Sequence, residues 1–439
     1  MSDQNNSVFE QRVASLRELL DQNDLDALIV SHDDEYLSYE LNEDEERLKY
    51  ITGFSGSAGY AVITSNDLKI NEENIEINQD NTENGIVVDR DCAVFVDGRY
   101  VVQVKEQIDS DIFQDFDLAK VKPAKWISSV MPKNSTVGID INCVSYEEYI
   151  SIKNELGMNN INLVATENNL VDKIWTDKPA SVISEISIFP DEYNGCPSPQ
   201  KRQLIAQTLR DKDLDATVIC DPESICWLLN IRGKDRAYLP VINCKMVAYS
   251  NEALEWYINP NHFKDENLQD QLQEHIGHID IFPEEAFDDV LDRLCSSSCT
   301  VYVDPETTNA HVMTKLYSGG AKVSEGLGLC QMPKACKNHI EVAGEYKAHI
   351  KDGIAMCRFI SWLDNLTALD KPTDSDETFL RRVEGVDEAE LAARALSFRK
   401  VEAGFIEPSF ATISALGPNA AMCLSLIHIS EPTRPEPIS

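Results

Sequence analysis

The first 30 residues change from a helical to a strand-like hydrophobic pattern, and the same change recurs about 190 residues later. Apolar side chains from Leu16 onward return every three or four positions, which predicts an amphipathic helix. An almost unbroken apolar run at residues 25–30 follows and predicts a buried strand. Residues 204–220 repeat both patterns and end in Leu214-Asp-Ala-Thr-Val-Ile-Cys. The chain therefore carries an internal repeat whose unit opens with a helix and a strand.

The repeat continues beyond this first helix and strand. In each copy an aromatic-led helix or turn then reaches a glycine, at residues 50–56 and at residues 227–233. Two strand-like runs come next, and each copy closes on a similar strand, Val137-Gly-Ile-Asp140 or Val301-Tyr-Val-Asp304. Helices that alternate with strands in this way are typical of an α/β fold with a mixed sheet. Because four elements recur in the same order, we expect two tandem α/β domains.

Two segments differ in composition from the copies. Residues 190–199 are rich in Pro, Gly and Ser, so we expect them to link the two copies. Residues 71–85 form an acidic, Asn-rich insert between two strand-like runs of the first copy. This composition predicts a solvated loop.

A different pattern begins near residue 331. Asn338-His-Ile-Glu341 has the spacing of a capping box, in which the Asn and Glu side chains satisfy free backbone amides. Apolar residues then recur over residues 343–363 and predict one long amphipathic helix. A second helix is expected over about residues 377–400, followed by a strand region at residues 404–422 that turns at Gly-Pro-Asn.

Composition narrows the classes of ligand and compartment. Asp and Glu number 75 against 39 Lys and Arg, a net charge of −36, so unaided binding of nucleic acid is the least expected activity. No apolar run approaches the ~18 residues of a membrane helix, and residues 1–10 do not resemble a secretory signal. The twelve cysteines lack a Cys-x-x-Cys pair. We expect reduced thiols in a cytoplasmic protein.

Most familiar catalytic motifs are absent. Gly53-x-x-Gly56-x-x-Gly59 lacks the Lys and Ser or Thr of a phosphate loop, so a tight turn is the better interpretation. His275 and His278 have Gly277 between them, which favours surface histidines over a helical metal pair. Asp97-Gly-Arg-Tyr100 ends a predicted strand with a turn that projects Arg99, a candidate for ligand binding. An ordinary surface arginine at a strand end is the alternative.

Taken together, the motifs resemble the three-domain, cytosolic form of the Xaa-Pro aminopeptidase (aminopeptidase P) family. The resemblance covers about residues 9–423 in the same order. The matching runs are Glu46-Arg-Leu-Lys-Tyr-Ile-Thr-Gly-Phe-Ser-Gly-Ser-Ala-Gly59, Val96-Asp-Gly-Arg-Tyr100, Ile174-Trp-Thr-Asp-Lys-Pro179, Trp227-Leu-Leu-Asn-Ile-Arg-Gly233, Lys334-Ala-Cys-Lys-Asn338, Ala348-His-Ile-Lys-Asp-Gly353 and residues 412–422.

The resemblance implies an α/β chain with two creatinase-like N-terminal domains, residues 1–180 and 181–330. The N-terminal part of a pita-bread (α+β) peptidase domain would follow at residues 331–423. The family removes the N-terminal residue from peptides with proline in second position, using two divalent metal ions, commonly manganese, held by two Asp, one His and two Glu. The resemblance also implies a homodimer and a role for Arg99 in substrate binding.

The sequence departs from the family after the Gly-Pro-Asn run. Leu424 stands where the family has a substrate-binding histidine, and no Asp follows Asp387. Only His428, Glu431 and Glu436 remain as candidate ligands after Cys423, too few for the five-ligand metal site. Residues 424–439 resemble a translated sequencing adapter, so we expect a truncated catalytic domain with a non-native tail, without metal ligands and inactive.

Two other functions stay open. A non-catalytic pita-bread relative that binds a basic protein partner, as histone chaperones do, would suit the net charge of −36. The retained Asp97-Gly-Arg-Tyr100 run argues against a pure binding module. Creatinase or prolidase chemistry on the same fold is disfavoured, because those relatives have a single N-terminal domain.

Overall fold

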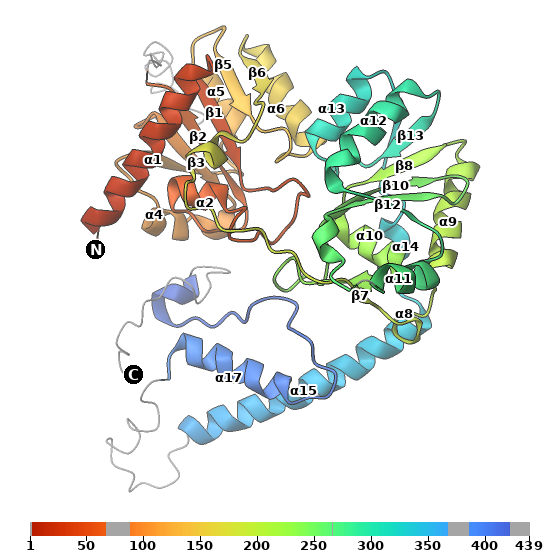
Figure 1. The fold of residues 1–439 in the computed structure, drawn as a ribbon. Helices are drawn as coiled ribbons and strands as arrows, with labels where there is room; N and C mark the ends of the chain where they lie inside the picture. Colours follow the sequence, from red (N-terminus) through yellow and green to blue (C-terminus); the bar gives the residue numbers. More distant parts are fainter. Residues whose placement is uncertain (1, 67–87, 266, 368–385, 422–439) are drawn as a thin grey trace, which may run out of the picture. The chain divides into compact units, whose positions relative to one another are not determined.

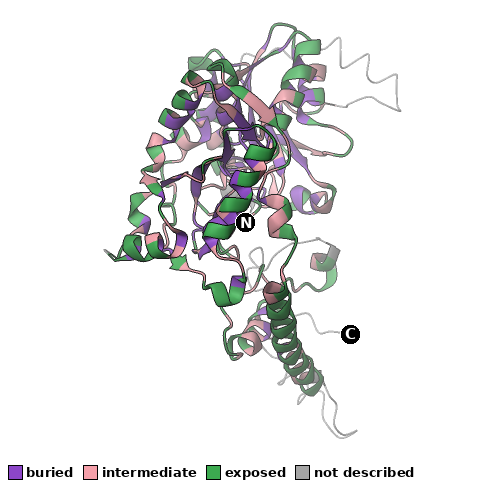
Figure 2. Cartoon of the chain, turned by 90° about the vertical axis from the view of Figure 1, so that its right-hand side faces the viewer, coloured by how far each residue is buried: buried purple, intermediate pink, exposed green. Residues whose placement is uncertain are grey.

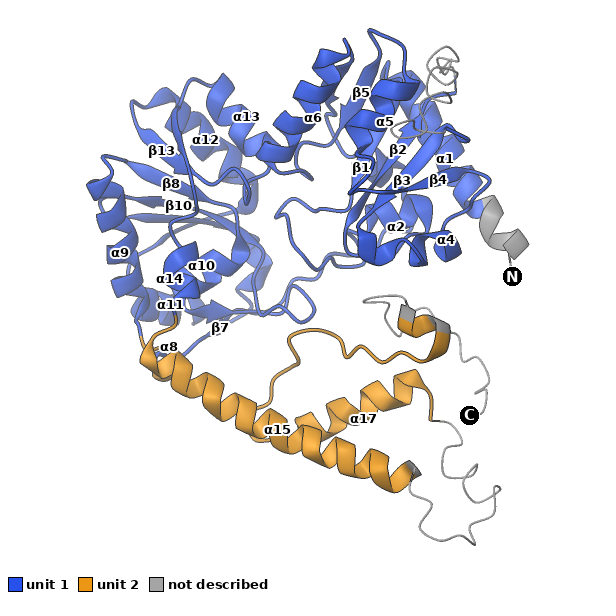
Figure 3. Ribbon diagram, turned by 180° about the vertical axis from the view of Figure 1, so that it is seen from behind, with its two compact units in different colours: residues 1–191, 196–336 blue, residues 192–195, 337–439 orange. Residues whose placement is uncertain are grey.

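The computed structural model of the chain describes residues 2–66, 88–265, 267–367 and 386–421, which form two compact units (Figure 3). Unit 1 contains the described residues up to 191 and residues 196–336, and unit 2 contains residues 192–195 and those from 337 onward. The insert predicted at residues 71–85 and the tail at residues 424–439 lie outside the described residues.

The first half of unit 1 is a six-stranded mixed sheet with the order β4-β3-β2-β1-β5-β6 (Figure 1). Its strands are β1 (Ala27–Ser31), β2 (Gly59–Thr64), β3 (Cys92–Val96), β4 (Phe113–Asp117), β5 (Thr136–Ile139) and β6 (Asn162–Ala165). Its helices are α1 (Ser2–Gln22), α2 (Arg47–Thr52), η1 (Gly98–Tyr100), α4 (Gln103–Gln107), α5 (Pro123–Val130), α6 (Tyr146–Met158) and α7 (Leu170–Ile174).

The second half of unit 1 repeats this plan, with the strand order β12-β11-β10-β8-β13-β14. Its strands are β8 (Ala216–Ile219), β10 (Cys244–Tyr249), β11 (Leu254–Ile258), β12 (Asp280–Phe282), β13 (Thr300–Val303) and β14 (Lys322–Glu325). Its helices are α9 (Ser198–Asp211), α10 (Pro222–Leu229), η2 (Pro260–His262), α11 (Leu268–Ile276), η3 (Glu284–Ala286), α12 (Phe287–Ser296), α13 (Ala310–Ser318) and α14 (Gln331–Ala335).

One aspartate anchors the central strands of each sheet in the same way. The Asp26 carboxylate, just before β1, accepts a hydrogen bond from the backbone N–H of Thr136 at 2.7 Å. Asp215, just before β8, accepts one from Thr300 at the same distance. Both aspartates come from the Leu-Asp-Ala run that opens each repeat. The internal repeat predicted from the hydrophobic pattern is therefore confirmed in topology and in detail.

Helices cover both faces of each sheet and bury the apolar strands. In the first sheet, Trp126 of α5 and Tyr149 of α6 pack over the Ala27 and Ile29 side of β1. The second sheet has a core on each face, one beneath α9, α10 and α11 and the other beneath α12 and α13. Figure 2 shows the central strands of the sheets almost wholly buried. The predicted α/β fold with mixed sheets is confirmed.

The segment between the two sheets differs from the prediction. Residues 190–199 were expected to form a linker, but α8 (Asp191–Asn194) lies within them and α9 begins at Ser198. Just before α8, β7 (Ser187–Ile188) pairs with β9 (Ile231–Arg232). The irregular connection is instead at residues 175–186. A proline is well tolerated in the first turn of a helix, which explains why Pro199 lies inside α9.

Unit 2 is built on the long helix α15 (His339–Thr367), which packs against α17 (Glu388–Lys400). The predicted capping box is present: the Asn338 side chain accepts from the backbone N–H groups of Ile340 and Glu341, and Glu341 accepts from the N–H of Asn338 at 2.8 Å. Residues 377–385 of the predicted second helix lie outside the described residues.

The strand predicted at residues 404–422 is wrong for the part that the structure describes. Residues 404–416 have no regular structure, and Gly417–Ala421 form the short helix η4. Gly404 and Gly417 have positive φ angles of 82° and 59°, which interrupt an extended backbone. Among the described residues of unit 2 there is also no strand with which this segment could pair.

Candidate functional site

The Asp97–Tyr100 turn holds Arg99 in a fixed orientation at the end of β3. Asp97 is the N-cap of η1, and its Oδ1 accepts from the backbone N–H of Arg99 at 3.0 Å and from the Arg99 Nε–H at 2.7 Å. The backbone hydrogen bond from Arg99 is the main reason that the pKa of Asp97 is lowered. The Arg99 side chain is 38% exposed, so a ligand can reach the guanidinium.

The surroundings of the Arg99 guanidinium keep it protonated. The hydrogen bond that it donates to Asp97 is the largest cause, and its interaction with Tyr39 the next, by which the pKa of Arg99 is raised above its ordinary value. The guanidinium carbon also lies 5.2 Å from the centroid of the Tyr100 ring. Arg99 is therefore a permanent, oriented positive charge at the surface of the first sheet.

The glycine-rich run Gly53–Gly59 supports the base of this turn. Gly53 ends α2 with a φ of 84°, and a Cβ there would lie 2.8 Å from the carbonyl oxygen of Gln107. Further along the run, the Ser57 hydroxyl pairs with the buried Tyr100 hydroxyl at 2.7 Å. The run thus forms a turn between α2 and β2, as predicted, and its Ser57 fixes the position of the Tyr100 hydroxyl.

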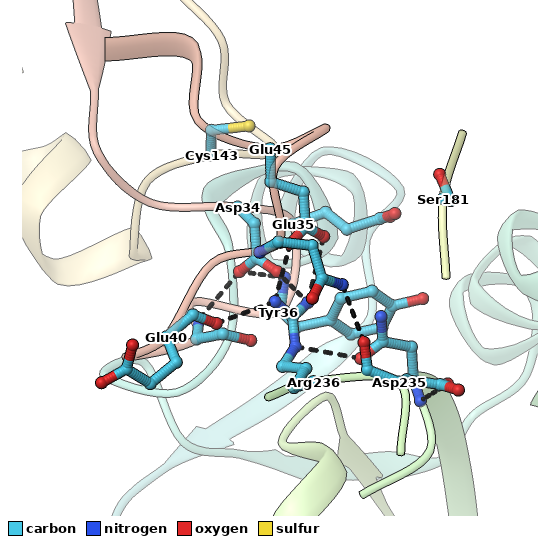
Figure 4. Close-up of polar contacts among 12 residues, drawn as sticks. Asp34, Glu35, Tyr36, Glu40, Glu45, Cys143, Ser181, Asp235 and Arg236 are labelled. Carbon is cyan, nitrogen blue, oxygen red and sulfur yellow. Dashed lines mark hydrogen bonds and ion pairs between the residues drawn. The ribbon is translucent and has the colours of Figure 1, made fainter. Parts of the chain in front are cut away.

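A buried charge cluster joins the two sheets of unit 1, centred on Arg236 (Figure 4). The Arg236 side chain is 1% exposed and lies in the loop between β9 and β10. Its guanidinium donates to Glu45 at 2.7 and 3.1 Å, to the backbone carbonyl of Glu40 at 3.0 Å, and to Asp34. All three acceptor residues belong to the loop between β1 and α2 of the first sheet.

Lys245 of β10 makes a second connection beside the first. Its ammonium donates to Glu35 at 2.8 Å and lies 3.5 Å from Glu284. Burial alone would lower the pKa of Lys245, but Glu35 and Glu284 outweigh it and raise the pKa. In the same way, burial would lower the pKa of Arg236, and the carboxylates of Asp34 and Glu45 raise it. Both cations are therefore charged in the folded protein.

Sequence reasoning singled out Arg99 and missed the cluster around Arg236. Arg236 and its three partners are about 190 to 200 positions apart in the chain. Neither segment has a hydrophobic pattern or motif that marks its charges as buried. Their pairing depends on how the two sheets pack, which a single sequence does not reveal.

The described residues do not fit a metal centre. In residues 2–66, 88–265, 267–367 and 386–421, no three His, Cys, Asp or Glu side chains are grouped so that they could hold a metal ion. His278 is 83% exposed, and His275 lies 3.3 Å from the carbonyl oxygen of Asn230. Leu424, His428, Glu431 and Glu436 lie outside the described residues. The part of the chain that the structure describes therefore holds no candidate set of metal ligands.

Two further predictions concern thiols and membranes. The described cysteines are all free, so they form no disulfide among themselves. In the described part of the chain, no helix has both the length and the apolar character needed to cross a membrane.

Both halves of unit 1 are similar to the same kind of domain in known proteins. Residues 12–82 and residues 177–341 each match a model of the creatinase/prolidase N-terminal domain. The chain is 29% identical over 428 residues to a Xaa-Pro aminopeptidase of Drosophila melanogaster, which covers 95% of this chain and 62% of the relative. It is 30% identical to a probable Xaa-Pro aminopeptidase P of Talaromyces marneffei, over 94% of this chain and 58% of the relative.

A solved structure shares the fold. The X-prolyl aminopeptidase of Caenorhabditis elegans, described as a cytosolic enzyme with a di-nuclear active site, superposes with a TM-score of 0.79. It is 23% identical, and the match covers 95% of this chain and 63% of that one. The chain thus spans about three fifths of the length of the relatives it matches. With its two creatinase-type halves and a match along nearly all of its length, the chain belongs to the Xaa-Pro aminopeptidase (aminopeptidase P) family.

Proposed function

We propose that this protein takes part in the metal-dependent release of the N-terminal residue from peptides with proline in second position. The observation that carries the proposal is the continuous match of 94–95% of the chain to Xaa-Pro aminopeptidases. The proposal includes domain boundaries at residues 180, 330 and 423, a cytoplasmic location, a homodimer and two divalent metal ions, with manganese as the expected metal.

Arg99 has the properties that a substrate-binding residue needs. Its charge is permanent, its orientation is fixed by Asp97, and part of the guanidinium remains open to a ligand. An arginine fork binds carbonyl or carboxylate oxygens of a peptide through paired hydrogen bonds. We assign Arg99 to holding the peptide backbone, with no part in the bond cleavage itself.

We further propose that the 439-residue chain alone is inactive. The family's ligand set of two Asp, one His and two Glu is expected after the Gly-Pro-Asn run at residues 417–419, and this sequence has no Asp after residue 387. Five pre-organised ligands are needed to hold two metals in a defined geometry. The few His and Glu residues after residue 423 do not meet that need.

The product of the complete reading frame, expressed from the source DNA with manganese, tests the peptidase. It should release arginine from an Arg-Pro-Pro peptide and not from the matched Arg-Ala-Pro peptide. Arg99→Ala should raise KM for Arg-Pro-Pro, whereas Arg90→Ala, a control seven positions before Asp97 at the start of the turn, should not. Equal cleavage of the two peptides would contradict the proline specificity, and an unchanged KM would contradict the role of Arg99.

A binding function is the second candidate, favoured by the net charge of −36. A strongly acidic protein attracts basic partners such as histones over distances comparable to the Debye length. Titration of the chain with core histones at physiological salt distinguishes the two proposals. Saturable binding that persists in salt would favour the binding function, whereas binding that disappears with salt would leave the peptidase as the better account.

A further inference from the structure

The two halves of unit 1 contact each other where the chain leaves β5 or β13 and turns into the next helix. We call residues 141–147 the first corner and residues 305–311 the second corner. They correspond position by position, because each directly follows a strand-end aspartate of the internal repeat, Asp140 or Asp304. Each aspartate accepts a hydrogen bond from the backbone N–H two residues later, at 2.9 and 3.0 Å. The two corners therefore begin with the same turn.

Backbone hydrogen bonds join the two corners in symmetric pairs. The N–H of Tyr146 donates to the carbonyl of Thr308 at 3.1 Å, and the N–H of Ala310 donates to the carbonyl of Val144 at 2.9 Å. Ala310 occupies the position of Tyr146 in the repeat, and Val144 occupies that of Thr308. Each half thus gives the other the bond that it receives.

A second pair of bonds follows the same rule one position further along. The N–H of His311 donates to the carbonyl of Ile141 at 2.9 Å, and the N–H of Glu147 lies 3.4 Å from the carbonyl oxygen of Pro305. His311 corresponds to Glu147, and Ile141 corresponds to Pro305. The symmetry therefore extends along both corners.

Ser145 and Asn309 lie at the centre of this contact. They form an isolated antiparallel β-bridge, and because they occupy corresponding positions, each pairs with its own counterpart. Each is also the N-cap of its helix, where its side chain accepts from the backbone N–H three residues later. A position that pairs with its own counterpart marks a local two-fold axis. The helices that start here, α6 and α13, lie side by side in Figures 1 and 3.

The symmetry belongs to the backbone and not to the side chains. The first corner reads Ile-Asn-Cys-Val-Ser-Tyr-Glu and the second Pro-Glu-Thr-Thr-Asn-Ala-His, with no identical residue at any position. The centre of the contact is shielded from water, since Val144 and Ala310 have no exposed surface and Thr308 is 1% exposed. Two different sequences therefore dock in the same way because their backbones follow the same path.

We propose that the corner is a self-complementary docking surface, whose fitting partner is a second copy of the same corner, and that this chain supplies the copy itself through its second half. Contacts in which each side gives what it receives are those of an isologous interface between identical subunits. Here the surface is saturated within one chain. The homodimer must therefore form through a different surface, a step that rests on the proposed function.

A chain whose two corners have one sequence tests the self-complementarity. Residues 141–147 are replaced by Pro-Glu-Thr-Thr-Asn-Ala-His, which exchanges Tyr146 for a smaller residue and so avoids overpacking. Amide exchange at residues 310 and 311, whose N–H groups donate across the contact, should change by less than about threefold relative to the matched control Tyr146→Ala. Fast exchange there, with β5 still protected, would show that particular side chains hold the contact and would overturn the proposal.

Two single substitutions complete the test. Tyr146→Pro removes one N–H donor at a helix position that tolerates proline, and it should accelerate exchange at residue 310 by roughly tenfold or more. Ser145→Asn covers the case in which the chain with exchanged corners fails to fold, because it places the same capping residue on both sides of the axis. It should leave residues 310 and 311 protected; loss of that protection in a folded Ser145→Asn chain would overturn the proposal.

Sedimentation velocity of the reading-frame product tests the saturation of the surface. Tyr146→Pro loosens the corner and should leave the homodimer intact. A homodimer that dissociates in this variant would mean that the corner joins separate chains, and would overturn the proposal. A monomeric unsubstituted product would instead contradict the homodimer of the proposed function, and the exchange results would stand.

Discussion

At the scale of single residues, Arg236 is a buried cation whose removal should lower the stability of the folded protein. It neutralises two carboxylates at a site that is 1% exposed. Removing one partner of such a buried group costs about 3–5 kcal/mol, because the others remain charged without compensation. Arg236→Met should therefore lower the free energy of unfolding by about that amount, measured by urea denaturation.

The triple variant Asp34→Asn, Glu45→Gln, Arg236→Met separates charge from packing. It leaves no uncompensated charge among the three, so it should recover a large part of the stability that the single variant loses. If the triple variant is as unstable as Arg236→Met, packing of the arginine rather than charge compensation dominates.

Asp33, the neighbour of Asp34 in the chain, makes the stability of the folded protein depend on pH. Burial first, and then the nearby charge of Glu148, raise the pKa of Asp33 from 3.8 to about 7. The folded protein thus holds this proton more tightly than the unfolded chain does. Its contribution to stability is present below about pH 4 and is lost as the pH rises through 7.

Asp33→Asn removes this titration. The melting temperature of the variant should therefore rise relative to the unsubstituted chain between pH 5 and pH 8. The exposed Asp289, substituted in the same way, is the control and should give a constant difference. A constant difference for Asp33→Asn as well would show that the carboxyl does not titrate in this interval.

At the scale of elements, the capping box of α15 is testable by one substitution. Asn338→Ala removes the acceptor for the N–H groups of Ile340 and Glu341 and should cost about 0.5–2 kcal/mol in the first turn of the helix. Faster amide exchange at residues 340–342 would report it. Asn365→Ala, an exposed substitution near the other end of α15, should leave that turn unchanged; equal exchange in both variants would contradict the cap.

The sequence predicted the elements whose signals are local. The Leu-Asp-Ala runs, the strand-like runs and the Asn338–Glu341 spacing each determine structure within a few residues of themselves. The strand expected at residues 404–422 fails because a strand needs a partner, and its sequence says nothing about one. The Arg236 cluster likewise depends on contacts between distant segments, so only the folded chain reveals it.

At the scale of the whole molecule, α15 is exposed along most of its length (Figure 2), and several of its exposed side chains are apolar. Tyr346 is 71% exposed and Ile350 is 64% exposed. A groove of about 750 Å³ between α15 and α17 continues this surface and is lined by apolar side chains that include Ile354, Trp362 and Phe398. Exposed patches of this kind promote association.

We therefore expect the purified chain to self-associate as its concentration rises. Ile350→Glu should reduce this association, measured by sedimentation velocity. His349→Glu adds the same charge one position away, outside the apolar stripe, and should have a smaller effect. Equal effects of the two variants would mean that net charge rather than the apolar surface controls association.

One assay tests both the proposed peptidase activity and the proposed inactivity of the 439-residue chain. The 439-residue chain and the product of the complete reading frame are incubated with manganese and an Arg-Pro-Pro peptide, with and without a chelator, and free arginine is measured. We predict that only the reading-frame product releases arginine and that the chelator abolishes the release. Chelator-sensitive release by the 439-residue chain itself would contradict this prediction.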